Sequence, residues 1–250
     1  EPNDSGRDNI FDFLFRTHLK NVYRYLDLDT PKYLDDPLSD ISTSKPSKYP
    51  KSLITPNING KNVVDEDDEW NNAGHIEIPD GPALRESKLF DKIRFGNDQN
   101  NFYLKFHLNK YIKENLELSK RTYQMYIYTR KASHRQDLSP VRLINKTKNI
   151  TPVSMEKFHN EIQIAIRNNK LQLLRIIKAI PGDMWVLEMS KSIEAVYDEV
   201  LDLKIPFDIL GIKSGETLEF LFINANYGVK DFYIPNETVL NVTRPALEKK

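Results

Sequence analysis

Several segments of this chain alternate apolar and polar residues with a period of two, and this pattern limits the fold more than any other feature. In residues 102–108, phenylalanine or leucine occupies every second position. Residues 123–130 alternate in the same way, with Tyr123, Met125 and Ile127 on one parity. Because successive side chains of a strand point to opposite faces, each segment is expected to form a strand with one buried face.

Residues 158–180 are predicted to form a β-hairpin. The pair Asn168–Asn169 separates two apolar runs, and asparagine tolerates the positive φ angles of tight hairpin turns. Further strands are predicted over residues 73–78, 184–189, 195–206, 216–228 and 238–245. About nine short strands without long helices between them are typical of an antiparallel β-sandwich, so we predict a mainly β chain.

Residues 9–27 are predicted to form one N-terminal helix. Apolar residues recur there at steps of three and four, which places them on one stripe of the helix. The stripe consists of Phe11, Leu14, Phe15, His18, Leu19, Val22 and Leu26. Such a stripe must cover the sandwich, pair with a second copy or remain exposed, and exposure of that length invites self-association.

Residues 29–62 have the composition of a connector. They contain five prolines together with many serines and lysines. The apolar residues that could anchor them to a surface are Tyr33, Leu34, Leu38, Leu53 and Ile54. The chain is therefore predicted to divide into a helix over residues 1–28, a connector over 29–62 and a β-sandwich over 63–250.

The overall charge and the absence of cysteine restrict the partners. The 36 basic residues balance 36 acidic ones, and a nucleic-acid-binding protein usually needs a basic surface, so no nucleic acid is expected. No apolar run approaches the ~20 residues of a membrane span, so no membrane partner is expected. The chain has no cysteine, which excludes thiolate metal sites and fits a reducing compartment, and we expect a cytoplasmic protein.

The stretch "DEWNNAGHIEIPDG" resembles an active site at first sight, because carboxylates, a tryptophan and a histidine lie close together. The acidic run over residues 65–69 is most simply a solvated loop before a strand, and calcium binding there is the alternative. The histidines have no metal-ligand spacing, and the common nucleophile and phosphate-loop motifs are absent. We therefore expect no catalytic residue, no metal and no cofactor in this chain.

Aromatic side chains are the better candidates for a binding site, because sugar rings stack on their faces. Tyr126 and Tyr128 lie two residues apart on the polar parity of one predicted strand, as a carbohydrate platform requires. The alternative, which we favour, is that a second element covers them. Trp70 and Trp185 are further sugar-binding candidates, and packing in the core is favoured for both.

Three segments, in this order, resemble glycoside hydrolase family 57 proteins and their relatives. "FDFLFRTHLKNVYRYLDLDTPKYLDDPL" is similar to the end of the core region of that family. "EWNNAGHIEIPDGPALRESKLFDKIRFGNDQNNFYLKF" is similar to the start of its C-terminal β-sandwich, and "LDLKIPFDILGIKSGETLEFLF" to a late strand–turn–strand of that domain. The late strands also resemble family 9 carbohydrate-binding modules.

The resemblance implies that this chain is the C-terminal part of a longer, α-glucan-active protein. Enzymes of the family retain anomeric configuration through a glutamate nucleophile and an aspartate acid/base on an N-terminal distorted barrel, and no segment here matches those motifs. The implied function is a non-catalytic accessory domain that stabilises or positions the catalytic part, with that part and an α-glucan as partners. The alternative is an independent carbohydrate-binding module.

Overall fold

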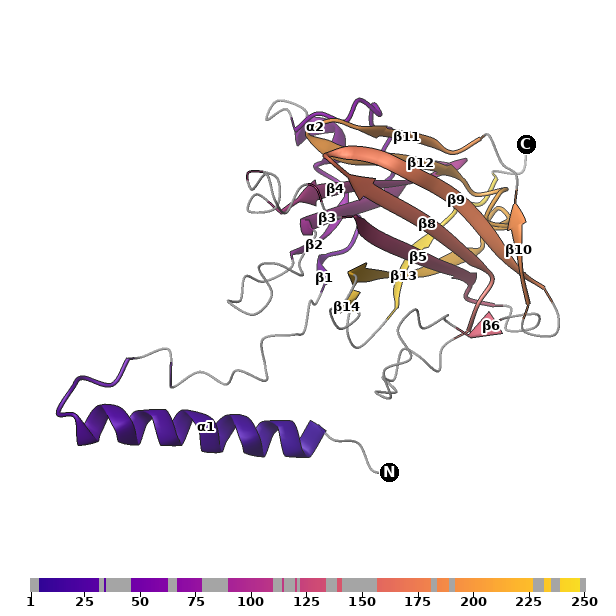
Figure 1. The fold of residues 1–250 in the computed structure, drawn as a ribbon. Helices are drawn as coiled ribbons and strands as arrows, with labels where there is room; N and C mark the ends of the chain where they lie inside the picture. The colour runs from indigo at the N-terminus through magenta and orange to yellow at the C-terminus, as the bar shows by residue number, and fades with distance from the viewer. Residues whose placement is uncertain are drawn as a thin grey trace. The chain divides into compact units, whose positions relative to one another are not determined.

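The computed structural model confirms the predicted fold class, a mainly β chain with two antiparallel sheets stacked as a sandwich and one long N-terminal helix (Figure 1). It describes residues 5–31, 34, 46–62, 67–77, 90–109, 114, 120, 122–133, 139–140, 157–180, 184–188, 192–226, 232–234 and 239–247. The chain forms two compact units, Glu1–Thr43 and Ser44–Lys250. The second unit thus begins before residue 63 and includes the C-terminal part of the predicted connector.

The first unit contains the helix α1, Ser5–Tyr25, close to the predicted bounds. In the turn after the helix, Asp27 has a positive φ of 53° and its amide donates to the carbonyl of Arg24, while the amide of Leu28 donates to the carbonyl of Tyr23 over 2.9 Å. These contacts satisfy carbonyls at the end of the helix. Two residues of the apolar stripe, Leu14 and Phe15, are exposed and retain 55% and 54% of their accessible surface. Within the described segments, no helix is long and apolar enough to cross a membrane.

The first sheet of the sandwich follows the strand order β1-β2-β3-β4-β12-β11, and every pair in it is antiparallel. Its strands are β1 (Pro46–Lys48), β2 (Gly74–Glu77), β3 (Phe90–Asn97), β4 (Asn101–Leu108), β11 (Glu194–Tyr197) and β12 (Val200–Pro206). The short helix α2, Asp67–Trp70, precedes β2.

The second sheet follows the order β10-β9-β8-β5-β13, and the far side of β13 is shared by β14 and β15. Its strands are β5 (Tyr123–Lys131), β8 (Asn160–Arg167), β9 (Lys170–Ile180), β10 (Met184–Glu188), β13 (Thr217–Asn226), β14 (Phe232–Ile234) and β15 (Leu240–Thr243). A separate two-stranded ladder joins β6 (Ser139–Pro140) to β7 (Lys157–Phe158).

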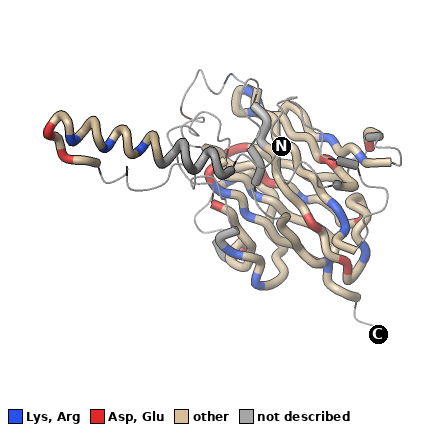
Figure 2. The backbone as a smooth tube through the Cα atoms, turned by 90° about the horizontal axis from the view of Figure 1, so that it is seen from below, with Lys and Arg blue, Asp and Glu red and all other residues tan. Residues whose placement is uncertain are grey.

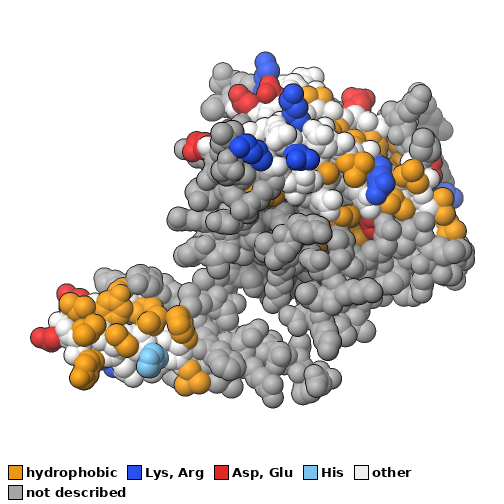
Figure 3. Space-filling view, in the orientation of Figure 1, with side chains coloured by type: hydrophobic (Ala, Val, Ile, Leu, Met, Phe, Trp, Pro, Cys, Tyr) orange, Lys and Arg blue, Asp and Glu red, His pale blue; other side chains and the backbone are white. Residues whose placement is uncertain are grey.

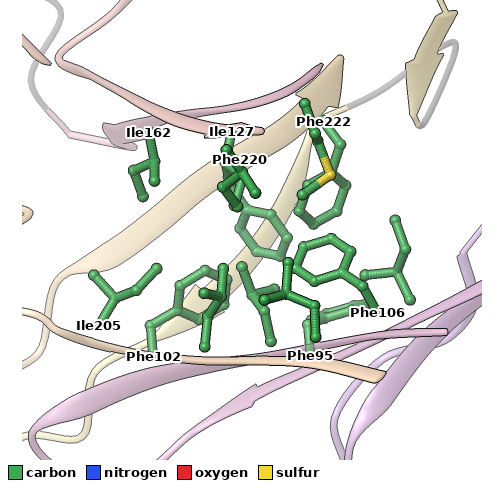
Figure 4. Close-up of a cluster of buried hydrophobic side chains, with 14 of the residues drawn as sticks. Phe95, Phe102, Phe106, Ile127, Ile162, Ile205, Phe220 and Phe222 are labelled. Carbon is green, nitrogen blue, oxygen red and sulfur yellow. The ribbon is translucent and has the colours of Figure 1, made fainter. Parts of the chain in front are cut away.

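The hydrophobic core lies between the two sheets and is rich in phenylalanine. Figure 4 shows side chains from β3, β4 and β12 pointing toward side chains from β5, β8 and β13. Phe220 lies at the centre, with ring centroids 4.8 Å from Phe102 and 5.4 Å from Phe95. Such tilted and edge-on ring pairs add to the stabilisation that burial alone provides.

The alternating pattern predicted the core-facing side of β5 and of β8 correctly, although Phe158, which was expected to face inward with Ile162, Ile164 and Ile166, lies in a separate cluster with Tyr128. Tyr123, Met125 and Ile127 all point into the core from β5. The β8–β9 hairpin turns at Asn168 and Asn169, which have positive φ angles of 51° and 52°, as the turn prediction requires. The predicted hairpin and the inward parity of β5 are both confirmed.

The predicted strand over residues 195–206 is wrong in one respect, because it is two strands. β11 and β12 pair antiparallel, and residues 198–199 turn the chain between them. The strands β1 and β3 were also missed. The described part of the chain therefore has six strands in one sheet and seven in the other, more than the predicted nine.

Candidate functional site

The aromatic platform predicted on β5 is not formed, because Tyr126 and Tyr128 are buried. Tyr128 has no accessible surface and Tyr126 retains 9%. They lie on the face of the second sheet that points away from the core, in a second cluster with Phe158, Leu221 and Ile223. The ring of Phe158 lies 5.7 Å from that of Tyr128, and neither tyrosine offers a free ring face for a sugar.

A row of hydrogen bonds crosses this same face beside the tyrosines. The hydroxyl of Tyr128 donates to Glu161 over 2.6 Å, and the amide of Gln163 donates to the other oxygen of that carboxylate. Arg175, which is exposed, donates its Nε to Gln163 over 2.5 Å. Glu161 itself has no accessible surface. A general acid or base must reach its substrate, so this buried carboxylate has a structural role in the present conformation.

A second arginine, Arg130, packs against the same cluster. The Nε of Arg130 donates to the carboxylate of Glu219 over 2.5 Å, and its guanidinium lies 5.1 Å from the ring centroid of Phe158. Because the guanidinium is almost fully buried, the ion pair and the cation–π contact reinforce the packing of Phe158 over the sheet.

Trp70 packs against the outer face of the first sheet, as the favoured prediction stated. It retains 2% of its surface and clusters with Ile54, Ala73 and Tyr103. The ammonium group of Lys105 lies 5.2 Å from the centroid of its ring. Trp70 therefore anchors α2 to the sheet, and its ring does not face solvent.

Residues 49–62, here called the strap, lie across the outer face of the first sheet. The amide of Lys51 donates to the carbonyl of Asn72, and that of Ile54 to the carbonyl of Asn97. At the other end of the strap, the carbonyl of Gly60 accepts the amides of residues 199 and 200. Ile54 packs directly against Gly96. A β-carbon added to Gly96 would lie only 2.6 Å from the Cδ1 atom of Ile54. The strap is therefore an integral layer of the sandwich.

A buried ion pair lies beneath the strap. Lys105 of β4 and Asp202 of β12 approach to 3.8 Å, and their side chains retain 4% and 0% of their accessible surface. Asp202 also accepts the amide of Gly60 over 2.9 Å, and Lys105 donates to the carbonyl of Lys61 over 3.3 Å. The pair therefore joins two neighbouring strands to the strap, and its burial makes loss of either partner costly.

Asp98 organises the turn between β3 and β4. Its carboxylate accepts the amides of Asn100 and Asn101 and the hydroxyl of Tyr103, each over 2.6 Å. Burial alone would raise the pKa of Asp98, but these hydrogen bonds outweigh burial and hold the pKa below its ordinary value of 3.8. Burial, followed by the contact with Asp98, raises the pKa of the Tyr103 hydroxyl.

The predicted acidic loop is only partly described. Residues 65 and 66 lie outside the described residues, while residues 67–69 belong to α2. Glu69 accepts the backbone and side-chain amides of Asn57, so its carboxylate ties α2 to the strap. In the part of the chain that is described, no group of three or more histidines and carboxylates has the geometry to hold a metal ion.

The side chain of Trp185, the fourth sugar-binding candidate, also lies outside the described residues. Its backbone lies in β10, opposite Ala179 of β9. Acidic and basic residues are interspersed along the described backbone of the sandwich (Figure 2). Each outer face also holds a buried carboxylate, Glu161 on the second sheet and Asp202 on the first.

No protein-family model matches the chain, and no curated protein matches it.

Proposed function

We propose that this chain is the non-catalytic accessory region of a longer, α-glucan-active protein similar to glycoside hydrolase family 57. The observation that carries the proposal is the exposed apolar surface of α1, where Leu14, Phe15 and Val22 each retain between 41% and 55% of their accessible surface. A contiguous apolar stripe on a helix is typical of a contact surface. The occupant proposed here is the catalytic part of the same protein.

The construction of the sandwich supports a stabilising or positioning role. Its first sheet is covered on the outside by the strap, and its second sheet carries the cluster of Tyr126, Tyr128 and Phe158. Hydrogen bonds and ion pairs are used there to fix the layers to one another. A rigid body of this kind can hold the C-terminal side of a catalytic domain in place. The lack of cysteine supports the cytoplasm as the compartment.

The test of this proposal uses the longer protein. Reading the coding sequence upstream of Glu1 should reveal a barrel domain with a catalytic glutamate and aspartate. The longer protein should hydrolyse or transfer α-glucan with retention of configuration, and the chain described here should turn over no chromogenic α-glucoside. A longer protein without α-glucan activity would overturn the proposal.

The alternative function is that of an independent carbohydrate-binding module. Its motivation was the pair Tyr126 and Tyr128, and both side chains are buried. In gels containing amylose or glycogen, the present chain is expected to migrate as it does in plain gels. Retardation by a glucan would favour the binding module. The Tyr126→Ala and Tyr128→Ala variants would then show whether the cluster opens to admit the sugar.

A further inference from the structure

β10 is an edge strand of the second sheet. It pairs with β9 along all five of its residues, Met184–Glu188. Among the strands that the structure describes, none pairs with its other side, and Figure 1 shows it at the margin of the sheet. The outward amide and carbonyl groups of such a strand are a template for pairing with another strand.

Within its five residues, β10 carries neither lysine nor proline, two residue types that usually protect an edge. Val186 and Leu187 lie on opposite faces of the strand and retain 48% and 47% of their surface. Its single charged residue, Glu188, is at the end of the strand and lies 3.3 Å from Lys178. Figure 3 shows hydrophobic side chains gathered on this part of the molecular surface. An apolar edge without lysine or proline favours strand pairing.

One edge of the first sheet contrasts with β10. β1 begins with Pro46 and ends with Lys48, and proline and lysine both discourage pairing. At the other edge, β11 resembles β10, because its one charged residue, Glu194, lies at the end of the strand and pairs with Lys204 of β12 over 2.8 Å. β1 therefore carries protecting residues, whereas the first four residues of β10 are methionine, tryptophan, valine and leucine.

We propose that β10 is a self-association surface on which two copies of this chain pair their β10 strands antiparallel. A two-fold axis at Val186 places that residue opposite its own copy and Leu187 opposite the partner's Trp185. This is the two-fold register that pairs all five residues, and it places Glu188 opposite Met184 rather than opposite another charge. The second sheet then continues from one copy into the other. The inference is independent of the proposed function.

The absence of cysteine from the natural chain makes a direct test available. Directly opposed residues of antiparallel strands have Cα atoms about 4.5–5.5 Å apart, inside the range that a disulfide spans. Val186→Cys should therefore form a disulfide-linked dimer under mild oxidation. Leu187→Cys is the matched control, because its exposure is nearly equal but its opposite residue is Trp185.

The expected result on a non-reducing gel is a dimer band at least about tenfold stronger for Val186→Cys than for Leu187→Cys, because a disulfide needs close, correctly directed β-carbons. Equal cross-linking of the two variants would indicate random collision and overturn the proposal. Preferential cross-linking of Leu187→Cys would overturn the register, and absence of cross-linking in both would overturn the pairing.

Sedimentation of the full chain provides a measurement without cross-linking. The native chain should reach twice the mass of one 29.2 kDa chain, and Val186→Lys should remain monomeric because an edge lysine blocks strand pairing. The Leu14→Asp/Phe15→Asp variant should still dimerise. A native chain that is monomeric contradicts the proposal. So does a dimer that the helix variant abolishes and Val186→Lys leaves intact.

Discussion

At the scale of single residues, one carboxylate holds the β3–β4 turn in place. Asp98 receives two backbone amides and the hydroxyl of Tyr103. Its folded pKa is lower than its ordinary value of 3.8, so the ionised form stabilises the fold. This contribution is present above the unfolded pKa and is lost as the pH falls through the folded pKa.

Asp98→Ala is therefore expected to lower the free energy of unfolding at pH 7 by about 1–3 kcal/mol, the usual cost of removing a charged acceptor. The partial exposure of the carboxylate favours the lower end of that range. Tyr103→Phe removes only one of the hydrogen bonds and should cost about 1 kcal/mol. Urea unfolding at a series of pH values should show the Asp98→Ala difference shrinking below pH 3.8. A difference that does not change with pH would contradict the assignment to the ionised carboxylate.

Two glycines with the same backbone conformation differ in their surroundings, and they provide a second prediction. Gly60 and Gly215 have φ angles of 72° and 79°. A β-carbon on Gly60 would lie 3.0 Å from the amide nitrogen of Asp198, while on Gly215 the nearest atom is 4.0 Å away. Gly215→Ala should cost about 1 kcal/mol for the backbone alone. Gly60→Ala should cost about 2 kcal/mol or more, because the strap must also move.

Thermal unfolding of the two variants measures this difference. Equal losses would mean that the strap tolerates displacement at Gly60, against the close packing seen at that end.

At the same scale, β5 shows that strand parity predicts which side chains face the core but not whether the opposite face is covered. Alternation correctly assigned Met125 and Ile127 to the core, because strand parity follows from backbone geometry. The same parity put Tyr126 and Tyr128 on the outer face, where they were candidates for sugar binding. Whether an outer face is covered depends on segments distant in sequence, such as that of Phe158, and no local pattern carries this information.

At the scale of elements, the strap converts an exposed sheet face into a buried one. Its contact with the sheet depends on Asp202, which accepts the amide of Gly60 and faces the ammonium group of Lys105. Neither Asp202 nor the proline-rich connector carries a sequence signal that the two segments would meet. The presence of the connector was predicted, and Ile54 does anchor it, but its partner strands became known only from the structure.

The two ion pairs of β12 test the role of burial. Asp202→Asn should lower the free energy of unfolding by about 3–5 kcal/mol, because the charge of Lys105 stays buried without its partner. Lys204→Met removes the exposed pair with Glu194 on the same strand and should cost at most about 1 kcal/mol. The double variant Lys105→Met/Asp202→Leu should recover much of the loss, since neither charge is then buried.

Denaturant unfolding of these variants gives the comparison. Similar costs for Asp202→Asn and Lys204→Met would contradict a buried, strap-holding role for the Lys105–Asp202 pair.

Strand prediction succeeded where a segment carries a strong local signal. The positive φ of Asn168 and Asn169 follows from residue type, and so the β8–β9 hairpin was found. β11 and β12 were merged, because residues 198–199 lack the glycine or proline that usually marks a turn. β10 was predicted as a strand, but its position at an edge is a property of the sheet order and could not be read from its residues.

At the scale of the whole molecule, the chain contains a packed sandwich and a helix on which several described apolar side chains are exposed. The sandwich has its own core between two sheets, from Ile76 of β2 to Val242 of β15. The helix of the first unit instead leaves Leu14 and Phe15 more than half exposed. An isolated helix of this kind is marginally stable, and most helical stability in proteins comes from packing of the apolar face. The account proposed here assigns that face to the catalytic part of a longer protein.

The most direct measurement of this claim is the half-life of α-glucan activity in the longer protein at a temperature of slow inactivation. Leu14→Asp/Phe15→Asp places two charges on the apolar stripe, and Thr17→Asp is the control because it adds a charge elsewhere on the same helix. The account predicts that the double variant shortens the half-life about tenfold or more, consistent with a loss of about 1.4 kcal/mol in the barrier to inactivation, while the control stays close to the native value. Equal half-lives for the native protein and the double variant would contradict a role for this chain in holding the catalytic part.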